Sequence, residues 1–193
     1  MIGIKSQDVV VLLKLVSLQA QEEEKSEPEG FESKIRGESP YSVRNLESRL
    51  GISKTEVNAS LKRIFSTGMA IKDHKTGRPK TNRRSLYNFI VHGLKFVFPA
   101  APGAMTRGIP TAFAAPMLKD LLLSGGNYIY VWPSAGGRDI GQSVQPLFKS
   151  VPEAAGKDAH LYEYLALVDA IRLGNQREMG LAKDRLSEKL LAK

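Results

Sequence analysis

The sequence contains no cysteine, and this absence excludes several classes of protein. A chain without thiols has no disulfide scaffold, thiolate zinc site, iron–sulfur cluster or cysteine nucleophile. Long hydrophobic runs are lacking too, because the apolar run at residues 9–13 is far too short to cross a bilayer. The first residues lack the basic stretch, apolar core and cleavage site of a signal peptide. We therefore expect a soluble, cytoplasmic protein.

Recognisable catalytic and cofactor motifs are absent as well. The sequence has no HExxH, GxSxG or Walker A motif, and the Gly-rich segment at residues 134–141 does not match a dinucleotide-binding loop. The three histidines lie singly, without a second histidine four residues on, which favours packing roles over metal ligation. Asp169 and Arg172 have the spacing of an ion pair on a helix surface. These observations predict a protein that is not an enzyme and has no cofactor or metal site.

The positive charge of the chain is concentrated in one segment. The chain has 193 residues, 42% of them hydrophobic, and a net charge of +8. Residues 1–40 have a net charge of −3, residues 41–95 of +9, and residues 96–193 of +2. A basic block of this size is typical of nucleic-acid binding, because Lys and Arg displace counterions from phosphates. A solvated basic surface is the alternative. The order of residues within the block has to decide between this surface and nucleic-acid binding.

Residues 41–67 have the pattern of two short helices joined by a tight turn. Ser42 can cap the first helix, and Gly51 can close it in the left-handed conformation. The second helix begins with a capping box, in which Ser53 is the N-cap and Glu56 follows three residues later. Two helices with this connection predict a helix-turn-helix.

The second of these helices, expected to run to about residue 66, has two different faces. When residues are projected at about 100° each, Val57 and Leu61 lie on an apolar face that can dock on a core. The opposite face offers an amide, a cation and small side chains, which suit the base edges of a major groove. An ordinary amphipathic surface helix is the alternative. The polar face carries Thr55, Asn58, Ala59, Lys62 and Ser66.

The segment at residues 68–84 follows as a short strand and a basic hairpin around Gly77 and Pro79. A basic hairpin after a recognition helix is typical of a wing that contacts phosphates or the minor groove. A flexible basic loop is the alternative. The expected DNA-binding residues are Ser42, Arg44, Ser53, Lys54, Thr55, Asn58, Lys62, Arg63, Lys75, Arg78, Lys80, Arg83 and Arg84.

The segments around this block are less specific. A helix expected at residues 6–20 is apolar nearly all round, so either the C-terminal part of the chain or a second copy has to cover it. The acidic residues 21–40 predict a surface loop. Residues 85–98 predict a helix with Ser85 as its cap.

The remaining sequence predicts a connector and a helical hairpin. Residues 99–157 are rich in Gly and Pro, with a helical turn expected at 118–123 and a short strand at 128–132. Residues 158–193 predict a helical hairpin for dimerisation, with its first helix capped by Asp158. Its apolar stripes can pack on the helix at residues 6–20, either within the chain or across a homodimer. The predicted fold class is therefore mainly α with a small β component.

The basic block also resembles a known family. Residues 41–84 resemble the winged-helix DNA-binding domain of MarR-like bacterial transcriptional regulators, and downstream stretches such as VWPSAGG are similar to a group of uncharacterised bacterial winged-helix proteins. The resemblance implies a winged-helix domain within residues 1–98, double-stranded DNA as partner and a homodimer, although residues 96–140 depart from the all-helical MarR plan. A protein-interaction module, such as an antitoxin or adaptor, and an RNA-binding winged helix are the alternatives. The matching positions are Leu46, Leu50, Gly51, Ile52, Ser53, Val57, Leu61, Ile64, Gly68 and Met69.

Overall fold

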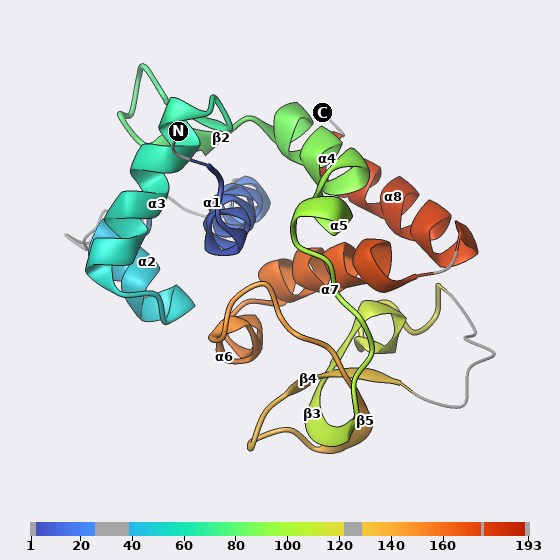
Figure 1. The fold of residues 1–193 in the computed structure, drawn as a ribbon. Helices are drawn as coiled ribbons and strands as arrows, with labels where there is room; N and C mark the ends of the chain where they lie inside the picture. The colour runs from blue at the N-terminus through green and yellow to red at the C-terminus, as the bar shows by residue number, and fades with distance from the viewer. Residues whose placement is uncertain (1–2, 26–38, 122–128, 175, 192–193) are drawn as a thin grey trace.

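The computed structural model describes residues 3–25, 39–121, 129–174 and 176–191. The fold is mainly helical with a small sheet component, as the sequence predicted (Figure 1). The elements in chain order are α1 (Ser6–Lys25), α2 (Val43–Leu50), α3 (Lys54–Ser66), β1 (Ala70–Lys72), β2 (Pro79–Thr81), α4 (Arg83–His92), α5 (Leu94–Val97), β3 (Met105–Thr111), the 3-10 turn η1 (Ala112–Ala114), β4 (Tyr130–Pro133), β5 (Asp139–Ser143), α6 (Val151–Gly156), α7 (Ala159–Leu173) and α8 (Gln176–Leu191).

The apolar part of helix α1 is enclosed on every side within a single chain. All side chains from Val9 to Ser17 are buried, and the helix packs against α3, β2 and α7. Figure 1 places α1 between α2 and α3 on one side and α4 and α7 on the other. The C-terminal part of the chain therefore covers this helix, which is one of the two alternatives that the sequence left open. No apolar face of α1 remains for a second copy of the chain to cover. The apolar character of this helix therefore does not support a homodimer, and the homodimer stays a prediction.

The helices expected at residues 6–20 and 85–98 have different bounds in the structure, and the second is divided into α4 and α5. Helix α1 continues to Lys25, through residues that the sequence assigned to an acidic loop, while residues 26–38 of that loop lie outside the described ranges. Helix α4 begins at Arg83, because the side chain of Asn82 accepts a hydrogen bond from the backbone N–H of Ser85 at 3.1 Å. Asn82 is therefore the N-cap, and the expectation that Ser85 caps this helix is wrong.

The expected connector contains three paired strands. Strand β3 pairs antiparallel with both β4 and β5, and β4 pairs parallel with β5, so the three strands form a closed sheet. Two glycines allow this close approach: a Cβ on Gly108 would lie 2.1 Å from the carbonyl oxygen of Trp132, and one on Gly137 would lie 2.2 Å from that of Gly108. The strand expected at 128–132 is present as β4, although residue 128 lies outside the described part. Of the helical turn expected at 118–123, the described residues 118–121 form hydrogen-bonded turns.

A buried carboxylate joins this small sheet to the helices. Asp169 on α7 accepts hydrogen bonds from Thr111 Oγ1 at 2.9 Å, Trp132 Nε1 at 2.6 Å and Arg172 NH1 at 2.7 Å. Burial raises the pKa of Asp169, and Arg172 and the other two donors oppose that rise. Asp169 and Arg172 are 2% and 8% exposed, so the expectation of an ion pair on a helix surface is wrong. The reason is that the sheet covers this side of α7.

Candidate nucleic-acid interface

Helices α2 and α3 meet in the turn that the local sequence predicts. The Ser42 side chain accepts a hydrogen bond from the N–H of Asn45 at 3.2 Å, and Gly51 has a φ of 63°. Ser53 caps α3, with the N–H of Glu56 donating to its hydroxyl oxygen at 3.4 Å. The capping box is only half formed, because the Glu56 carboxylate accepts from the Gln7 side chain. That contact ties the start of α3 to α1.

The outward face of α3 carries the polar side chains that the projection placed there. Thr55, Asn58 and Lys62 are exposed, whereas Val57 and Ile64 are buried. Within the part of the chain that the structure describes, the three exposed side chains make no hydrogen bond or ion pair with the rest of the protein. They are therefore available to a ligand that approaches this face.

Arg63 does not belong to that face, and its assignment as a DNA contact is wrong. Its guanidinium Nε and NH2 donate to the two carboxylate oxygens of Asp8 at 2.8 and 2.7 Å, and Ser60 donates to the same carboxylate. Arg63 is 7% exposed and Asp8 is fully buried. The hydrogen bonds to Asp8 raise the pKa of the Arg63 guanidinium. Arg63 thus fastens α3 to α1 instead of pointing outward.

The segment after α3 forms an antiparallel hairpin, as expected. In the β1–β2 pair, Ala70 lies opposite Thr81 and Lys72 lies opposite Pro79. Asp73 closes the turn by accepting hydrogen bonds from the backbone N–H and the hydroxyl of Thr76, and these bonds lower the pKa of Asp73. These hydrogen bonds fix the conformation of the turn, which carries the exposed Lys75 beside the exposed Lys80 of β2.

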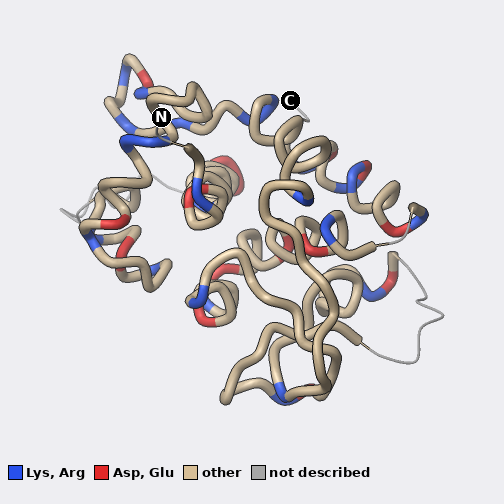
Figure 2. The backbone as a smooth tube through the Cα atoms, in the orientation of Figure 1, with Lys and Arg blue, Asp and Glu red and all other residues tan. Residues whose placement is uncertain are grey.

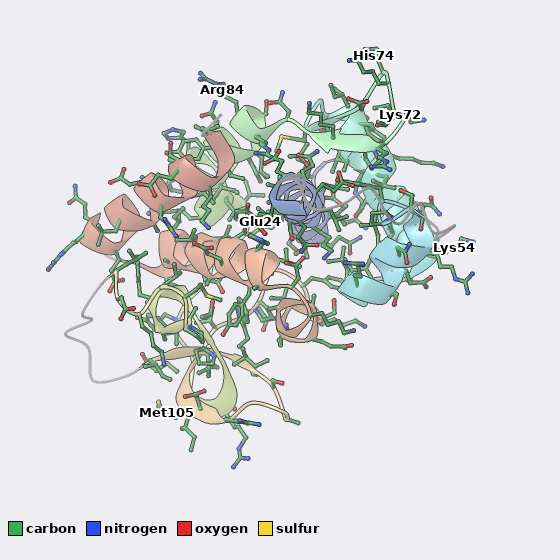
Figure 3. The ribbon with its side chains drawn as sticks, turned by 180° about the vertical axis from the view of Figure 1, so that it is seen from behind. Glu24, Lys54, Lys72, His74, Arg84 and Met105 are labelled. Carbon is green, nitrogen blue, oxygen red and sulfur yellow. The ribbon has the colours of Figure 1, made fainter. Side chains whose placement is uncertain are left out.

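The basic residues of the interface occupy several elements. Figure 2 shows Lys and Arg along the hairpin and at the start of α4. In Figure 3, Lys72 and His74 mark the hairpin, Lys54 lies on the side of α3, and Arg84 lies over α4. The exposed cations among the expected DNA-binding residues are Arg44, Lys54, Lys62, Lys75, Lys80 and Arg84.

Two further cations of the expected set already have partners within the chain. Arg78 NH1 donates to Glu22 Oε1 at 3.0 Å, and Arg83 NH2 donates to Glu23 Oε1 at 3.4 Å. The two glutamates belong to the end of α1, which the sequence assigned to a loop. A helical continuation of α1 could have been anticipated, because the run of glutamates contains no helix-breaking residue. The contact between the end of α1 and the hairpin could not have been anticipated, because it joins residues far apart in the sequence.

The described residues contain no group of three His, Asp or Glu side chains that could hold a metal ion. Over the same ranges, none of the helices combines the length and the apolar character that a membrane span requires. No family model, curated protein or solved structure matches this chain. The resemblance to MarR-like regulators therefore stays a prediction.

Proposed function

We propose that the protein binds double-stranded DNA and regulates transcription through a winged helix-turn-helix made of α1–α3 and the β1–β2 hairpin. The observation that carries the proposal is the outward face of α3, where Asn58 and Lys62 are exposed and, among the described residues, without partners. The hairpin that follows adds exposed lysines next to that helix. Together they provide an amide for bases and cations for phosphates.

The chemistry of these side chains fits a duplex. An Asn side chain can form two hydrogen bonds with the N6 and N7 atoms of adenine, and a Lys can donate to guanine or to a phosphate. Helix α3 has 13 residues, which corresponds to about 20 Å and suits a helix lying in a major groove. The exposed Lys75 and Lys80 would then contact the phosphates beside it.

Replacing Asn58 with alanine is expected to weaken binding to the preferred sequence by about 1–3 kcal/mol, the range for a bidentate base contact. Binding to random DNA should change little, because a base contact adds nothing there. The preferred site is first selected from a random-sequence duplex library, and both affinities are then measured by fluorescence anisotropy.

The matched control is Asn88→Ala, which removes another exposed asparagine, on α4. It should leave both affinities unchanged. An equal loss on the selected site and on random DNA in Asn58→Ala would contradict base reading by α3.

The hairpin lysines are expected to set the salt dependence of binding. In Lys75→Ala/Lys80→Ala, the slope of log K against log salt should decrease by about 0.9 for each phosphate that a lysine no longer neutralises. Lys119→Ala/Lys149→Ala removes the same charge from two exposed lysines outside the hairpin and should keep the wild-type slope. If both variants gave the same slope, the hairpin would not contact phosphates.

The alternatives predict other outcomes of these titrations. An RNA-binding winged helix would release DNA on addition of structured RNA, and a protein-interaction module would show no salt-dependent DNA binding.

A homodimer would place two α3 helices roughly 34 Å apart, one DNA turn. Sedimentation velocity at micromolar concentration measures that oligomeric state.

A further inference from the structure

Three consecutive glutamates at the end of α1 contact basic side chains from three different elements. Glu22 pairs with Arg78 of the hairpin at 3.0 Å, and Glu23 pairs with Arg83 of α4 at 3.4 Å. Glu24 lies 3.1 Å from the imidazole Nε2 of His160 on α7. Because the rest of α1 is enclosed in the core, these carboxylates extend from a fixed support.

Arg78 is held from two sides. Its guanidinium lies 5.2 Å from the centre of the Tyr41 ring, and the Tyr41 hydroxyl donates a hydrogen bond to Glu22 at 3.0 Å. Burial and the hydrogen bond to Glu22 raise the pKa of Tyr41, so the hydroxyl stays protonated and keeps donating. Arg78 lines a cavity of about 500 Å³ between α1 and the hairpin. Lys80 and Arg83 line the same cavity.

We propose that Glu22 and Glu23 form an autoinhibitory contact that restrains binding of nucleic acid or another polyanion by the hairpin. This inference rests on the proposed function, because Arg78 and Arg83 are two of its expected phosphate contacts. A phosphate backbone recruits these arginines only after the two ion pairs open. Lys75 and Lys80, which form no ion pair in the described part of the chain, bind without that step.

The geometry favours a contact that opens readily. The Arg78 and Glu22 side chains are 43% and 47% exposed, and Glu23 is 70% exposed. Exposed ion pairs are weak and are screened by salt, so each can restrain binding by no more than about fivefold. The two carboxylates also repel phosphates, and this repulsion acts in the same direction.

The test is the double variant Glu22→Gln/Glu23→Gln. Glutamine removes the charge but keeps one of the two oxygens, and because Tyr41 and Arg78 donate to different oxygens of Glu22, that oxygen can retain the bond from Tyr41. We expect the affinity for random duplex DNA at 0.1 M salt to rise by about 5- to 20-fold. We also expect the salt slope to steepen by as much as about two units, because two more phosphates are neutralised.

The control is Asp184→Asn/Asp120→Asn, which removes the same charge from exposed positions on α8 and in the turn after η1, where neither carboxylate has an ion pair with a described residue. It measures the effect of net charge alone. Thermal melting checks that each variant is folded. Arg78→Ala, made in wild type and in the glutamine variant, provides a second measurement, since freeing Arg78 should make its removal cost more affinity.

A heparin column separates this inference from the proposed function. If wild type and variant both fail to bind DNA, but the glutamine variant elutes at higher salt than the control, the proposed function is wrong and the restraint on polyanion binding stands. If the variant and the control behave alike on DNA and heparin, and Arg78→Ala costs the same in both backgrounds, the autoinhibitory contact is refuted. Weaker binding by the variant would also refute it, because the glutamates would then hold the arginines in their binding position.

Discussion

Replacing Arg63 with methionine should lower the free energy of unfolding by about 3–5 kcal/mol, the usual cost of removing one partner from a buried ion pair. The substitution leaves the Asp8 carboxylate, which is fully buried, without its guanidinium. Ser60 and the backbone N–H of Lys5 still donate to that carboxylate, but neither carries a compensating charge there. Urea denaturation followed by circular dichroism measures the loss.

The neighbouring lysine provides the control for this prediction. Lys62→Met changes an exposed side chain on the same helix and should alter stability by no more than about 0.5 kcal/mol while weakening DNA binding. Asp8→Asn/Arg63→Met removes both charges and should recover much of the lost stability. The assignment of Arg63 would be overturned if Arg63→Met were as stable as wild type and bound DNA as weakly as Lys62→Met.

Replacing Lys14 with methionine should have an effect of similar size, about 3–5 kcal/mol. Lys14 is 1% exposed in the middle of α1, and its ammonium donates to Asp158, the N-cap of α7. Burial lowers the pKa of Lys14, and Asp158 opposes that shift. Without the lysine, Asp158 keeps the hydroxyl of Ser17 and the N–H of Leu161 as donors but loses the only charge that pairs with it among the described residues.

The double variant Lys14→Met/Asp158→Asn tests whether charge is the cause. An asparagine still caps α7, so this variant should be more stable than Lys14→Met alone. Equal losses in the two variants would mean that packing around Lys14, and not the unpaired carboxylate, determines the stability.

The same pair predicts how stability depends on pH. Burial raises the pKa of Asp158, but hydrogen bonds from Lys14, Ser17 and Leu161 outweigh burial and hold the pKa below its ordinary value. A carboxylate with a lowered pKa in the folded state stabilises the protein above its unfolded pKa, and this stability is lost as the pH falls through the folded value. Acid should therefore destabilise wild type more than the double variant, and urea titrations at neutral pH and in acid below the ordinary pKa of an aspartate, about 3.9, compare them.

Helices α2 and α3 and the turn between them were predictable because their signals are local. The Ser42 and Ser53 caps and the left-handed Gly51 depend on backbone groups within four residues of each, so the sequence contains the whole interaction. The closed three-stranded sheet was not predictable in the same way. Its strands are short, interrupted by Gly and Pro, and defined by pairing between distant segments.

The same difference between local and long-range interactions decides which residues of the candidate interface were predictable. The projection of α3 separated Asn58 and Lys62 from Val57, because the helical repeat alone sets those directions. Arg63 lies on the flank between the two faces, where the outcome depends on what packs against the helix. Helix α1 covers that flank and supplies Asp8, so a basic residue expected to bind DNA became part of the core.

The sequence by itself determined where the helices around the turn begin, which face of α3 is polar, and that the first helix has to be enclosed. Only the tertiary structure decided that α7 encloses it and that Arg63, Arg78 and Arg83 pair with carboxylates of α1. The physical reason is range. Caps and helical faces arise from neighbouring residues, whereas the charge that a side chain presents to a ligand depends on burial and ion pairs with residues far away in the chain, 55 positions for Arg63 with Asp8 and 144 for Lys14 with Asp158.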